Sequence, residues 1–106
     1  MNDRMKLNLL ERLALLQILP EEGNFVTLKV IRDLKSSVGI TADEFKEFEL
    51  IEKDGQLTWN AKGQEEKEFV LPDKARSICS EQLKKLSESN KLNKNHISLY
   101  EKFVEN

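Results

Sequence analysis

The chain has 106 residues, the size of one ordinary domain, so we expect a single domain over residues 1–106. Its 17 basic and 19 acidic residues leave a net charge of -2 at pH 7, which is too balanced to attract nucleic acid or an anionic membrane over long range. The one cysteine, Cys79, excludes an internal disulfide. The fold therefore needs no oxidising compartment, and we expect a cytoplasmic protein.

A leucine-rich segment near the start of the chain predicts the first helix. Asn8 is suited to cap it, and Glu11 three positions later completes a capping-box pattern. The helix should end before Pro20. Because Glu11, Arg12 and Gln17 are its only polar residues, we expect it to form the centre of this domain or to meet a second chain. The segment is too short to span a bilayer and lacks a signal-peptide cleavage site, so no membrane association is expected.

Two further helices are predicted before residue 50. The second should begin between Asn24 and Thr27, and its apolar stripe has helical spacing at Leu28, Ile31, Leu34 and Val38, which Val30 widens. The third is short. It should begin at the Thr41 cap, with Glu44 as the capping-box partner, and end near Phe48.

After the third helix the hydrophobic pattern alternates, which is typical of strands. Asp54 and Gly55 are preferred in a two-residue hairpin turn, where both central residues need a positive φ, and this hairpin would place Ile51 opposite Thr58. The segment Lys67 to Leu71 is predicted as a third, shorter strand. We expect one antiparallel sheet of two or three strands, with helices covering one face.

Two helices should complete the chain, one from Pro72 and Asp73 to about Ser89 and one from Asn93. The predicted fold class is therefore α+β, with three N-terminal helices, a small antiparallel β-sheet built on the hairpin at Asp54-Gly55 plus a third strand, and two C-terminal helices.

The residue types that most often carry chemistry form no recognisable constellation. His96 is the only histidine, and Cys79 lies among apolar neighbours where a thiol packs as a small hydrophobic group. Four carboxylates gather around the third helix and are expected to be a solvated cap: Asp43, Glu44, Glu47 and Glu49. We therefore expect no enzyme, no catalytic residue, no cofactor and no metal site.

A nucleic-acid interface is the alternative hypothesis. Lys29, Arg32 and Lys35 line one side of the second helix, a spacing that can follow phosphates, and three helices followed by a hairpin resemble a winged-helix DNA binder. The third helix would enter the groove in such a protein. Because that helix is acidic, phosphate would repel it, and nucleic acid is the less favoured partner.

The chain also resembles small uncharacterised proteins of bacterial and phage or prophage genomes. The resemblance rests on Leu9-Leu10-Glu11-Arg12-Leu13 through Ile18-Leu19-Pro20, on Gly23-Asn24-Phe25, on Leu28-Lys29-Val30-Ile31-Arg32, and on Leu99-Tyr100-Glu101-Lys102-Phe103. These motifs are core patterning and caps, so they imply an accessory protein of bacterial or phage origin and carry over no functional residue. Our leading hypothesis is a non-catalytic protein–protein interaction module that binds a protein partner or forms a homodimer through its first helix.

Overall fold

The computed structural model describes residues 4–105, and between them the chain forms an α+β domain with five α-helices and two small antiparallel sheets. The helices are α1 (Leu9–Ile18), α2 (Phe25–Val38), α3 (Ala42–Glu47), α4 (Asp73–Glu88) and α5 (Ile97–Phe103). The strands are β1 (Arg4–Leu7), β2 (Ile51–Lys53), β3 (Gln56–Thr58) and β4 (Lys67–Val70). Two short 3-10 helices, η1 (Ala61–Gln64) and η2 (Lys94–His96), lie in the connections.

Helices α1, α2 and α3 begin directly after the capping residues Asn8, Asn24 and Thr41, whereas the predicted start at Asn93 begins η2, and α5 follows from Ile97. In α1 the Asn8 side chain accepts a hydrogen bond from the Glu11 backbone N–H, and the Glu11 carboxylate accepts one from the Asn8 N–H, which completes the capping box. Thr41 and Glu44 form the same reciprocal pair at the start of α3. These local hydrogen bonds satisfy backbone donors that the first helical turn leaves open.

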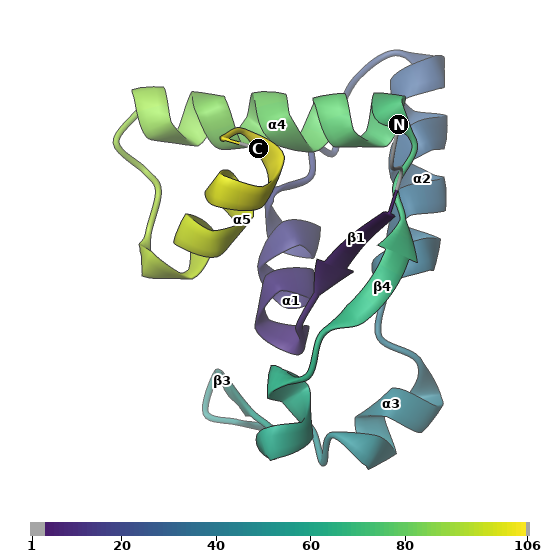
Figure 1. Cartoon of the computed structure of the whole chain (residues 1–106), viewed down its shortest axis with the longest axis vertical. Helices are drawn as coiled ribbons and strands as arrows, with labels where there is room; N and C mark the ends of the chain where they lie inside the picture. The colour runs from purple at the N-terminus through teal and green to yellow at the C-terminus, as the bar shows by residue number, and fades with distance from the viewer. Residues whose placement is uncertain (1–3, 106) are drawn as a thin grey trace.

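The strands do not form the single sheet that we predicted. The hairpin is confirmed: β2 and β3 pair with Ile51 opposite Thr58, and the turn residues Asp54 and Gly55 have φ values of 52° and 78°. The predicted third strand exists as β4, but it pairs with β1, an N-terminal strand that the pattern did not predict. Figure 1 shows the result, with β1 and β4 side by side and the hairpin at the other end of the molecule from α4.

The β1–β4 ladder has one buried face and one exposed face. Directly opposite residues share a face, so Met5 and Phe69 lie together on the inner side. Lys6 and Glu68 lie on the outer side. The core that this sheet covers draws on α1, α2, α4, α5 and both of its strands: Leu7, Ala14, Leu15, Leu19, Ile31, Leu34, Val38, Phe69, Leu71, Ala75, Cys79, Leu83, Leu99 and Phe103. Helix α1 contacts α2, α4 and α5, so it is the central helix of the domain.

Candidate functional site: an apolar groove between α2 and α4

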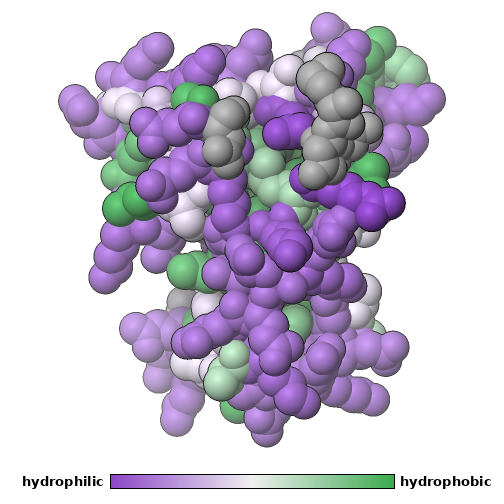
Figure 2. Space-filling view, in the orientation of Figure 1, coloured by the Kyte–Doolittle hydropathy of each residue, from purple (hydrophilic) through white to green (hydrophobic). Residues whose placement is uncertain are grey.

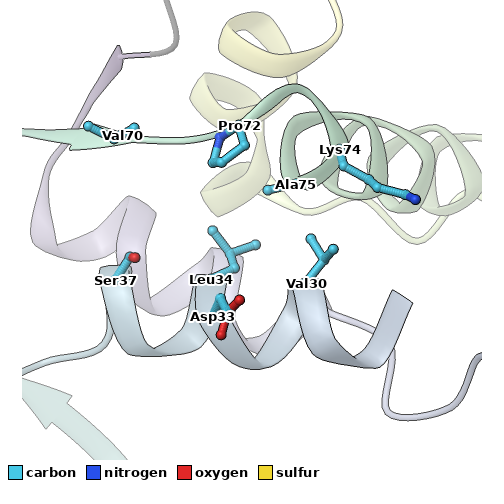
Figure 3. A pocket seen from close by; sticks show the side chains of 8 residues that line it. All are labelled: Val30, Asp33, Leu34, Ser37, Val70, Pro72, Lys74 and Ala75. Atoms are coloured by element: carbon cyan, nitrogen blue, oxygen red, sulfur yellow. The ribbon is translucent and has the colours of Figure 1, made fainter. Parts of the chain in front are cut away.

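An apolar groove lies where α2 faces the junction of β4 and α4. Figure 3 shows Val30 and Leu34 rising from α2 toward Pro72 and Ala75, while the Lys74 side chain is directed away. Its volume is about 320 Å³, and its lining, called the α2–α4 groove from here on, consists of Val30, Asp33, Leu34, Ser37, Val70, Pro72, Lys74 and Ala75. Asp33 and Lys74 place one charge of each sign on its two helical walls.

The sequence builds this groove partly from core residues, Leu34 and Ala75, and partly from residues beside the core pattern. Val30 lies beside the stripe that α2 buries and is half-buried against the core, so it widens the apolar face of the helix. Val70 follows the buried Phe69 along β4, and because successive strand residues point to opposite faces, its side chain is turned away from the core. Pro72 fixes the backbone where β4 ends and α4 begins.

Exposed hydrophobic side chains gather along the same surface. Val70 is 59% exposed, and Val26 is also exposed one helical turn before Val30, on the same side of α2. On the face shown in Figure 2, hydrophobic residues occupy small separate areas between hydrophilic ones. Single exposed hydrophobic residues are normal, but Val70 borders an apolar hollow, and such a hollow is a candidate interaction site.

A buried ion pair lies elsewhere and is structural. The Arg12 guanidinium donates two hydrogen bonds to the Glu44 carboxylate, at 2.7 and 2.8 Å, and further bonds to the carbonyls of Val38 and Gly39. It also lies 4.9 Å from the centroid of the Phe69 ring. The hydrogen bonds from Arg12 lower the pKa of the Glu44 carboxyl from 4.5 to about 2. Each of the three guanidinium nitrogens donates to a partner, so the pair ties α1 to α2, α3 and β4.

This ion pair corrects the expectation of a solvated acidic cap. Of the four carboxylates that we expected in a solvated cap, Asp43, Glu47 and Glu49 are exposed, but Glu44 is buried. Arg12, one of the few polar residues of α1, is buried as well. The capping-box pattern correctly predicts that Glu44 bonds to the backbone at Thr41, but it does not show that the other side of the carboxylate meets Arg12.

A second charged cluster connects the two ends of the described chain. The Lys102 ammonium of α5 donates to the Lys6 carbonyl of β1 at 2.7 Å, to Glu11 at 2.8 Å and to Glu66 at 2.7 Å. Burial alone would lower the pKa of Lys102, but the hydrogen bonds to Glu11 and Glu66 outweigh burial and raise it. The hydrogen bond from Lys102 in turn lowers the pKa of Glu66. All three donor positions of Lys102 are used, so this cluster too holds the fold together.

The two residues considered for catalysis are placed differently. Cys79 belongs to the core, and burial raises the pKa of its thiol to about 12, so it is almost entirely protonated at neutral pH and a poor nucleophile. His96 is bonded locally: its Nδ1 accepts from the Asn93 backbone N–H at 3.2 Å. Within residues 4–105, no group of three or more His, Cys, Asp or Glu side chains is arranged to hold a metal ion.

The basic residues of the nucleic-acid hypothesis lie on a different side of α2 from the groove. Lys29, Arg32 and Lys35 are all exposed. Arg32 and Lys35 share a shallow depression with Glu21, and Arg32 also lies 3.6 Å from the Asp33 carboxylate. Neighbouring carboxylates thus dilute the positive charge that a phosphate backbone would require.

The first helix exposes less apolar surface than its sequence suggests. Leu10 is the one large hydrophobic residue of this helix that is exposed in the described chain, while Leu13, Leu16 and Ile18 are half-buried. No helix in the described part of the chain is long and apolar enough to cross a membrane.

The sequence analysis did not predict the α2–α4 groove, because its lining joins α2 to β4 and α4. The one local sign of it was that Val30 widens the apolar stripe of α2.

Comparison with known proteins gives no family for this chain: no family model, no curated protein and no solved structure matches it. The resemblance to small bacterial and phage proteins stays a prediction.

Proposed function

We propose that the chain is a non-catalytic protein–protein interaction module, and that its partner contributes an apolar segment to the α2–α4 groove. The observation that supports this proposal is the groove itself, where Val30, Leu34 and Ala75 form an apolar floor beside the exposed Val70. Apolar pockets that receive side chains of a partner supply much of the affinity in protein interfaces.

The walls of the groove specify the chemistry of the partner segment. Asp33 on α2 favours a basic residue, and Lys74 on α4 favours an acidic one. We therefore expect apolar side chains flanked by charges of both signs. This proposal moves the docking surface away from α1, since most leucines of that helix are at least half-buried.

The structure offers a closely matched pair of residues for the test. Val70 on β4 is 59% exposed and Ile51 on β2 is 58% exposed, yet only Val70 lines the groove. A photo-crosslinking amino acid is placed at either position in the full chain, in host cells, and crosslinked proteins are identified by mass spectrometry. We expect one protein to be captured from position 70 and not from position 51.

Direct binding then decides the outcome. With the captured protein purified, Val70→Glu should weaken binding by about tenfold or more, because it places a charge against an apolar contact, while Ile51→Glu should leave the affinity unchanged. Equal effects of both variants, or equal capture from both positions, would contradict the proposal. Sedimentation of the purified chain over a concentration series shows whether the captured partner is a second copy.

The alternative of a nucleic-acid partner has its own measurement. If Lys29, Arg32 and Lys35 contacted phosphates, binding to duplex DNA or RNA would weaken steeply as salt concentration rises. We expect no such binding at low ionic strength, since Glu21 and Asp33 lie among these residues.

A further inference from the structure

A second cavity lies between α1, the end of the β2–β3 hairpin and η2. Its volume is about 280 Å³. Leu10 and Leu13 of α1 and Leu57 and Trp59 of the hairpin region form its apolar part, and Asn95 and His96 contribute polar groups. Neither the groove nor either ion-pair cluster includes these residues, so the function proposed above does not account for them.

The Trp59 ring packs against Gly63 at this cavity. A Cβ atom placed on Gly63 would lie 2.4 Å from Trp59 Cδ1 and 2.7 Å from Nε1, so the indole rests directly on the Gly63 backbone. Trp59 is half-buried and lines the cavity. A partly open indole is a suitable surface for stacking an aromatic ring.

His96 lines the same cavity and carries a hydrogen-bond donor. The residue is only 8% exposed, and its Nδ1 accepts from the Asn93 N–H, so the proton of the neutral imidazole is on Nε2. Because no fully buried side-chain nitrogen or oxygen in the described chain lacks a partner, an Nε2 without a protein partner keeps some exposed surface.

The lining also limits the charge and the size of a ligand. It contains no Lys, Arg, Asp or Glu, so a charged group would lose its hydration there without gaining a counter-charge. A volume of about 280 Å³ is at the small end for ligand sites and suits one or two fused rings. We propose that this cavity binds an uncharged heteroaromatic ring with the chemistry of a nucleobase, stacked on Trp59, with an acceptor on its edge bonded to His96 Nε2–H and the Asn95 amide.

Trp59 is the only tryptophan of the chain, so its fluorescence reports on this cavity. The full chain is titrated with adenosine, guanosine, cytidine and uridine, and adenosine monophosphate tests the effect of charge. We expect a saturable change in emission with at least one nucleoside, and weaker binding when the phosphate is present. The absence of a saturable change with all four nucleosides, or binding that requires the phosphate, would overturn the proposal.

Three variants establish where the ring binds. Asn95→Ala removes the side-chain amide but keeps the Asn95 backbone N–H, which donates a hydrogen bond to Asn93 Oδ1 at 2.8 Å. His96→Asn keeps an acceptor close to the position of Nδ1 and removes the Nε2 donor. Each should weaken binding by about tenfold, whereas Lys94→Ala, on η2 but outside the cavity lining, should not change it. Unchanged affinity in both of the first two variants, with an unchanged melting temperature, would place the ring elsewhere and refute this site.

Discussion

The two sheets of this domain are almost equal in size and differ in what holds them. The β2–β3 hairpin joins neighbouring segments through the Asp54-Gly55 turn, and all six of its strand residues are exposed. The β1–β4 ladder joins residues sixty or more positions apart, and it buries Leu7 and Phe69 against the core. The turn therefore holds the β2–β3 hairpin together, whereas packing against the core holds the β1–β4 ladder. Substitutions in the hairpin should have local effects, and substitutions beneath the ladder should lower the stability of the whole domain.

The largest effect should follow from removing Arg12, which lies beneath Phe69 of β4. Arg12→Met removes the hydrogen bonds that Arg12 donates to the buried Glu44 carboxylate and to the carbonyls of Val38 and Gly39. Breaking a buried ion pair from one side costs about 3–5 kcal/mol, and urea denaturation should show a loss of unfolding free energy of this size. The double variant Arg12→Met/Glu44→Met should recover part of it. A loss of unfolding free energy below about 1 kcal/mol would show that the Arg12–Glu44 pair contributes little to the stability of the domain.

Acid should weaken the region around the same ion pair. The pKa of Glu44 is about 2 in the folded chain against an ordinary value of 4.5, so its stabilising contribution is present above pH 4.5 and is lost as the pH falls toward 2. The full shift corresponds to about 3 kcal/mol. Unfolding measured between pH 7 and pH 2 should lose most of this dependence in Glu44→Gln. An identical pH profile in that variant would assign the acid sensitivity to other carboxylates.

Lys102→Met tests how strongly the outer edge of β1 is held. The substitution removes the hydrogen bonds to the Lys6 carbonyl, Glu11 and Glu66 but keeps most of the aliphatic length. Because Lys102 is only half-buried, we expect a loss of about 2 kcal/mol, smaller than that for Arg12. Thermal unfolding provides the measurement, and Lys84→Met on α4, where the lysine is exposed, is the matched control.

The smallest global effect should come from the hairpin. Gly55 has a φ of 78°, so Gly55→Ala strains the turn by about 1 kcal/mol although nothing lies within 4 Å of the added Cβ. Amide exchange should rise in β2 and β3 and remain unchanged in β1 and β4. A cooperative loss of protection in both sheets would show that the hairpin is not the independent unit that its exposure indicates.

The same contrast explains what the sequence could predict. The capping boxes, the extents of α1 and α4 and the Ile51–Thr58 register were predictable because each depends on residues a few positions apart. Strand β1 was not, because four residues beside a leucine-rich helix carry little signal and their partner lies beyond the hairpin. Hydrophobicity also ranks Leu10 as more buried than Arg12, whereas the structure shows the reverse, since Arg12 satisfies its donors internally.

The candidate sites were harder to predict for the same reason. Val70 and Val30 form one groove only after β4 is placed against α2, and alternation along β4 shows that Val70 is turned outward without showing what it faces. The sequence left open whether His96 is solvated or bonded locally, and the structure shows it buried and bonded to the Asn93 backbone N–H. Its position near Trp59 depends on the packing of η2 against α1, which no spacing in the sequence encodes.

The pairing of β1 with β4 also bears on how the chain is made. On the ribosome β1 emerges before its partner strand, so it must wait unpaired until Val70 has left the exit tunnel, and Lys102, which binds the Lys6 carbonyl, emerges later still. The nascent chain can therefore form the hairpin before the β1–β4 ladder and the core that this ladder covers can close.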